Sequence, residues 1–110
     1  MAKPQTLHNA VADLIRRLAA SSDTVWTFGS YVRRDGGTHA RDEMKADGIE
    51  FADLIYVLRR CTVVRSEYVA KYGENRYRAV GRNVDGIEMT FIVTIREQKN
   101  NIEVVTAWAD

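Results

Sequence analysis

RYRAVGRNVDGIEMTFIVTIR, residues 76–96, alternates apolar and polar side chains on both sides of one glycine-containing turn. Alternation with a period of two is typical of a strand that buries one face, and Asp85-Gly86 is a strong turn signal. The stretch therefore predicts a β-hairpin with strands Arg76–Arg82 and Ile87–Arg96.

The length of the hairpin loop decides which residues enter the core. A two-residue loop at Asp85-Gly86 would pair Arg82 with Met89 and bring guanidinium groups onto the apolar face of the second strand. A three-residue loop, with Gly86 in the left-handed conformation, pairs Arg82 with Glu88 instead. Burying unpaired charge costs far more than a bulge, so we expect the second register. Its core face consists of Tyr77, Ala79, Met89, Phe91 and Val93.

The rest of the chain adds strands and helices around this hairpin. Period-two segments predict further strands at Thr62–Val69 and Ile102–Ala109, and helical spacing of apolar residues predicts helices at 6–20, 39–47 and 51–58. We expect an α+β fold in which N-terminal helices pack on one face of a roughly four-stranded antiparallel β-meander. Residues 1–110 form a single domain, with 1–37 as an N-terminal helix and loop extension and 38–110 as a helix pair plus the meander.

Smaller features complete this organisation. Residues 25–28 are a short β-prone segment, and residues 33–37 must be a loop. Thr38 is placed to cap the helix that follows, and Gly48 is placed to end that helix in a left-handed conformation. Trp108 continues the apolar parity of the last strand, so we assign it to the core, and Trp26 is expected between the first helix and the sheet. The single cysteine, Cys61, is expected to be buried rather than reactive.

Composition limits the class of protein. Among 110 residues 45% are hydrophobic and 28% charged, which is ordinary for one soluble globular domain. No run resembles a transmembrane helix or a signal peptide, so we expect a cytoplasmic protein that does not contact membranes.

Charge is segregated along the chain. Residues 59–82 include seven basic and two acidic residues. Their net charge is +5, whereas that of the whole chain is +1. Such segregation predicts a surface that meets an anion. In the expected register, arginines of the hairpin share the sheet face away from the helices, about 7 Å apart, close to the spacing of phosphates. The candidate anion-binding residues are Arg76, Arg78, Arg82, Arg96 and Lys71.

Two simpler interpretations compete with these sites. The arginines are alternatively solvated, or paired with Glu88 and Glu103 across the strands. His39, in the first turn of a helix, is a candidate general base because the helix dipole favours its neutral form, but it alternatively packs under the preceding loop. His8, His39 and Cys61 lack the spacing of a zinc site, so we expect no metal and no cofactor.

The run THARDEMKADGI, residues 38–49, followed by a helix and a meander, resembles a family of small bacterial domains of unknown function, DUF4258. Members typically read His-Ala-x-x-Arg-Met-x-x-Arg-Gly-Ile. Where that pattern has arginines this chain has Glu43 and Asp47, so a role of those arginines does not carry over. The residues that match are His39, Ala40, Met44, Gly48 and Ile49.

That family is similar in layout to RelE-like and BrnT-like toxin domains, which cleave RNA from a basic sheet face without a metal. The resemblance implies a metal-independent ribonuclease of toxin–antitoxin type, with His39, Arg78 and Arg82 as catalytic residues and RNA as the partner. The alternative is a non-catalytic module that binds an acidic protein, such as an antitoxin or a phage or host factor. A helix-turn-helix over residues 41–58 is disfavoured, because its second helix offers no basic or amide residue near its start.

Overall fold

The computed structural model describes residues 4–29 and 39–110. In chain order, its elements are α1 (Pro4–Ala20), β1 (Val25–Phe28), α2 (His39–Ala46), α3 (Phe51–Leu58), β2 (Thr62–Val69), β3 (Glu74–Arg82), β4 (Glu88–Arg96), the 3-10 turn η1 (Glu97–Lys99) and β5 (Asn101–Ala109). The expected loop at 33–37 and the expected cap Thr38 lie outside the described residues. The α+β class is confirmed.

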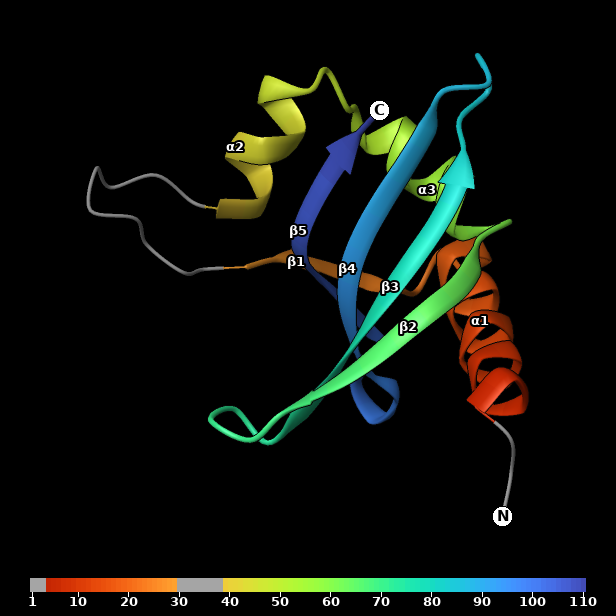
Figure 1. The fold of residues 1–110 in the computed structure, drawn as a ribbon, viewed down its shortest axis with the longest axis vertical. Coiled ribbons are helices and arrows are strands. Elements are labelled where there is room, and N and C mark those ends of the chain that lie inside the picture. Colours follow the sequence, from red (N-terminus) through yellow and green to blue (C-terminus); the bar gives the residue numbers. More distant parts are fainter. Residues whose placement is uncertain (1–3, 30–38) are drawn as a thin grey trace.

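The sheet has five strands in the order β1-β5-β4-β3-β2 (Figure 1). Strands β2 to β5 form the expected antiparallel meander. The expectation of four antiparallel strands is wrong at one edge, where β1 pairs in parallel with β5. The buried amide of Asn101 fixes this edge, because its Nδ2 donates to the Val25 carbonyl at 2.9 Å and to Thr27 Oγ1 at 3.1 Å.

The hairpin has the register expected from its charges. Arg82 lies opposite Glu88, and Gly86 takes a left-handed φ of 81°. The side chain of Asn83 holds the loop, because its Oδ1 accepts hydrogen bonds from the backbone of Asp85 and Ile87 at 3.0 and 2.9 Å. Because side chains alternate along a strand, successive residues of β3 and of β4 point to opposite faces of the sheet.

The core lies on the sheet face that α1 and α3 cover (Figure 1). Its largest fully buried side chains come from both helices and from the strands: Ile15, Leu54, Leu58, Phe91, Val93, Ile102 and Val104. Cys61, just before β2, is also fully buried, and burial raises the pKa of its thiol to about 11. Trp26 packs against this core, with its ring centroid 5.5 Å from that of Phe51.

A bulge in β5 corrects the assignment of Trp108. Ile92 pairs with Thr106 but Val93 pairs with Val104, so one residue of β5 is inserted between these pairs. The insertion reverses the parity of the strand. Trp108 therefore lies opposite Thr90 on the face away from α1 and α3, and its assignment to the core is wrong.

Among the described residues, none of the helices combines the length and the apolar character that crossing a membrane requires.

We expect the Cys61 thiol to be inert in the folded protein. With a pKa of about 11, only about one thiol in a thousand is ionised near pH 8, and the thiolate is the reactive form. Ellman's reagent should label native protein far more slowly than protein in guanidinium chloride. Rapid stoichiometric labelling of the native protein would contradict this.

Asn101→Ala should lower the free energy of unfolding by about 1–3 kcal/mol, because the Val25 carbonyl and the Thr27 hydroxyl lose the donor that the buried Asn101 amide supplies. Urea denaturation followed by circular dichroism measures the change. Gln98→Ala, at an exposed position of η1, is the matched control and should have an unfolding midpoint close to that of the wild type.

Candidate functional site

A groove of about 740 Å³ lies on the sheet face opposite to α1 and α3. Its walls come from β2, β3, β4 and β5, from the β2–β3 turn, from Gly29 after β1 and from the first residue of α2. The charged and aromatic side chains that line it are His39, Glu67, Tyr72, Glu74, Arg76, Arg78, Arg96, Glu103 and Trp108. Among the described residues, three arginines and three glutamates line the groove, so their charges balance apart from that of His39.

The outer edge of β5 determines where α2 lies. Within the part of the chain that the structure describes, β1 pairs with residues 101–104, and beyond them α2 lies along the edge. Glu43 Oε2 accepts a hydrogen bond from the backbone of Ala107 at 3.1 Å, and Asp47 Oδ2 accepts one from Ala109 at 2.8 Å. Glu43 Oε2 also accepts from the Thr106 hydroxyl. Two carboxylates one helical turn apart thus bind two amides two residues apart on the strand.

This docking brings His39 to the groove. His39 Nε2 lies 2.8 Å from Glu43 Oε1, one turn further along α2, and the two side chains are 30% and 25% exposed. The same carboxylate therefore holds both the strand and the imidazole. A carboxylate hydrogen-bonded to a ring nitrogen orients histidine for proton transfer, so the pair has the arrangement of a general base and its orienting group.

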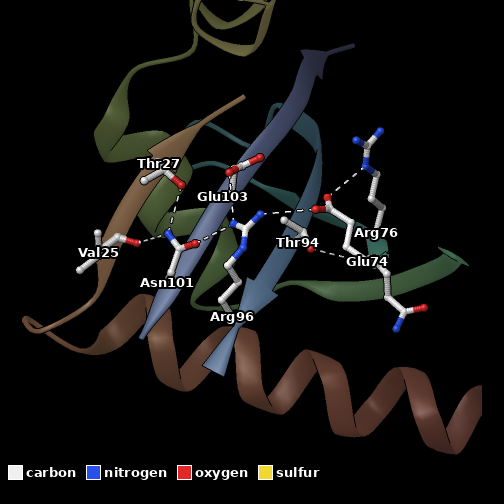
Figure 2. Close-up of polar contacts among 9 residues, drawn as sticks. Val25, Thr27, Glu74, Arg76, Thr94, Arg96, Asn101 and Glu103 are labelled. Atoms are coloured by element: carbon white, nitrogen blue, oxygen red, sulfur yellow. Dashed lines mark hydrogen bonds and ion pairs between the residues drawn. The ribbon is translucent and has the colours of Figure 1, made fainter. Parts of the chain in front are cut away.

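Two arginines of the groove are neutralised by glutamates (Figure 2). Arg96 lies between Glu103 and Glu74, with N–O distances of 3.1 and 3.4 Å, and Arg76 Nε lies 3.5 Å from Glu74. Arg96 also donates to Asn101 Oδ1 at 2.9 Å, which links the groove to the edge that holds β1. These two guanidinium groups thus act partly as structural links between strands.

Arg78 differs from Arg76 and Arg96. Within residues 4–29 and 39–110 it forms no ion pair, and its buried Nε has no hydrogen-bond partner. Its guanidinium carbon lies 5.5 Å from the centroid of the Trp108 ring. A buried guanidinium nitrogen without an acceptor carries a desolvation cost that an anionic ligand would offset.

The structure gathers part of the site proposed from the sequence. His39, Arg76, Arg78 and Arg96 line one groove. Arg82 points to the same face of β3 but lies outside the groove lining, where it donates to the Gly86 carbonyl at 3.4 Å. Lys71 also lies outside the lining, with its ammonium 5.4 Å from the ring of Tyr72. The alternative pairing with Glu103 occurs at Arg96.

Sequence reasoning did not assign three other residues to this site. The bulge puts Trp108 on the sheet face opposite to the expected one, and β5 contains no glycine or other local signal that predicts a bulge. Arg65 lies directly opposite Arg78 on β2, at a pairing that follows a second irregularity. Glu43 could have been identified from the sequence as a partner of His39, because a spacing of four residues places both on one helix face.

No group of three or more His, Cys, Asp or Glu side chains converges in a metal-binding arrangement within the part of the chain that the structure describes.

Glu43→Ala should lower the free energy of unfolding by about 1–3 kcal/mol, because the Ala107 amide and the Thr106 hydroxyl both lose their acceptor. Amide hydrogen exchange at Ala107 should accelerate together with it. Lys45→Ala, at an exposed position of the same helix, is the control and should leave both quantities near those of the wild type. Unchanged exchange at Ala107 in Glu43→Ala would contradict the docking role.

Comparison with known families places this chain. Residues 37–109 match the model of a family described as "Domain of unknown function (DUF4258)". No curated protein and no solved structure matches the chain. The matched segment holds α2, α3 and the meander, whereas α1 and β1 precede it. Since the match covers well over half of the chain, the protein belongs to the DUF4258 family of domains of unknown function.

Proposed function

We propose that the protein binds single-stranded RNA in the sheet groove and cleaves it without a metal ion. The observation that carries the proposal is the Nε of Arg78, which has no partner among the described residues and lies in the same groove as His39, the partner of Glu43. A cation without a counter-ion and an oriented base are the two groups that such a cleavage requires.

The reaction would proceed through the 2′-hydroxyl of the RNA. His39 accepts the 2′-hydroxyl proton while the 2′-oxygen attacks the adjacent phosphorus. The bond between phosphorus and the 5′-oxygen breaks, leaving a 2′,3′-cyclic phosphate, and the departing 5′-oxygen takes a proton from the imidazolium or from water. Arg78 stabilises the extra negative charge on the pentavalent phosphate. Glu43 orients the imidazole.

Two further points support RNA as the ligand. In the groove, Trp108 lies beside Arg78 and Tyr72 beside Arg76, and aromatic rings next to a guanidinium suit a base and its phosphate. We further propose that the family shares the metal-independent RNA chemistry of RelE-like and BrnT-like toxin domains, whose layout it was expected from the sequence to resemble. In that setting the physiological protein partner would be an antitoxin.

A second candidate function follows from the charge of the groove. Glu67, Glu74 and Glu103 balance its three arginines, which disfavours a long phosphate backbone along the whole face. The exposed ring of Tyr72, in the turn after β2, adds apolar surface to the groove lining. A protein partner of mixed charge would fit such a surface, in which case the module binds without cleaving.

Cleavage of single-stranded RNA should persist in the presence of EDTA. We expect Arg78→Ala to lower kcat/KM by about 10²–10³, because it removes transition-state charge stabilisation. His39→Ala should lower it by about 10²–10⁴, as loss of a general base does. Activity is measured on a fluorescent oligoribonucleotide, with folding of each variant checked by circular dichroism.

Arg82→Ala is the matched control, because Arg82 shares the strand and the sheet face of Arg78 but lies outside the groove lining. It should keep activity within a few-fold of the wild type. Equal losses in Arg78→Ala and Arg82→Ala would indicate general electrostatic attraction instead of a site. Arg78-dependent capture of a protein, with no RNA cleaved, would favour the second candidate.

A further inference from the structure

Arg65 and Arg78 form a like-charge pair across two strands. They lie directly opposite each other on β2 and β3, and both line a small cavity of about 90 Å³ beside the main groove. Like charges directly opposite on a sheet destabilise it unless something lies between them. Within the described ranges, neither residue forms an ion pair, and the Nε of Arg78 is buried without an acceptor.

The charge around this small cavity differs from that of the whole groove. Arg65, Arg76 and Arg78 line it together with a single carboxylate, that of Glu67. The carboxylate lies opposite Arg76, so the excess positive charge falls on the Arg65–Arg78 pair. The volume is about that of three water molecules in the liquid, which matches one phosphate group.

An aromatic surface adjoins the cavity. Arg78 extends over the indole of Trp108, at 5.5 Å from its centroid, and the bulge in β5 turns that indole into the groove. A guanidinium beside a partly buried ring that lines the groove offers a phosphate site and a stacking surface within one nucleotide of each other.

We infer that the Arg65–Arg78 cavity and the Trp108 ring form a subsite for one nucleotide of a single strand, with the phosphate on the guanidinium groups and a base on the indole. The inference rests on the proposed function for the identity of the polymer, but it requires no cleavage. It also reconciles the balanced charge of the groove with a nucleic acid, because only one phosphate needs a cation.

Thymidylyl-thymidine tests the subsite on the ¹⁵N-labelled full chain. This probe has one phosphodiester, two bases and no 2′-hydroxyl, so binding is read without cleavage. It should shift the NMR signals of the Arg78 Nε–H and of the Trp108 indole N–H while the Trp26 indole stays unchanged. Inorganic phosphate should shift the Arg78 signal only, and thymidine should shift only that of Trp108.

Affinity separates the two halves of the subsite. Thymidylyl-thymidine should bind at least about fivefold more tightly than inorganic phosphate, the gain of one weak stacking interaction. Trp108→Leu should remove that preference and Trp108→Phe should keep part of it. Arg65→Ala should weaken both ligands, whereas Arg82→Ala should weaken neither.

The outcomes distinguish this inference from the proposed function. Equal affinity for phosphate and thymidylyl-thymidine, or shifts that avoid Arg78 and Trp108, would overturn the subsite even if RNA is cleaved. Binding of thymidylyl-thymidine as described, with no cleavage of any RNA, would support the subsite while the ribonuclease proposal fails.

Discussion

The free backbone edge of β5 is the constraint on which the site depends. Among the described residues, β1 pairs with β5 only as far as Val104, and a backbone amide that leaves water without gaining an acceptor is costly. Glu43 and Asp47 satisfy this edge, since four helical residues advance about 6 Å and two strand residues nearly 7 Å. The same contacts hold α2 where His39 reaches the groove. Arginine has no acceptor, so a relative with the arginine pattern must hold its helix on β5 by other means.

The sequence predicted the hairpin well because two local constraints agreed. Charge could not be buried, and Gly86 supplied the left-handed residue that the favoured loop needs. Both constraints act within a few residues and are visible in one sequence. The pairing of β1 was not predictable in this way, because its partner is 76 residues away and its main anchor, Asn101, reads locally as an ordinary loop asparagine.

The candidate site was predictable to a similar degree. Alternation along β3 placed Arg76 and Arg78 on one face, and helix position singled out His39. The neighbours of each side chain on the adjacent strands were not predicted. Parity gives the face of a side chain but not its neighbour along the sheet, so it did not separate Arg82 from the groove. A single inserted residue in β5 was enough to turn Trp108 from the core to the groove.

The parallel pairing of β1 with β5 also bears on how the chain folds. Local contacts can form the β2 to β5 meander early, because each strand pairs with its neighbour in sequence. β1 must wait for a strand synthesised some 75 residues later, and closing so long a loop is entropically expensive. The pairing of β1 with β5 therefore has the highest contact order in the sheet, and we expect it to form last. During that interval β5 would expose an unpaired edge of the kind that promotes association between chains.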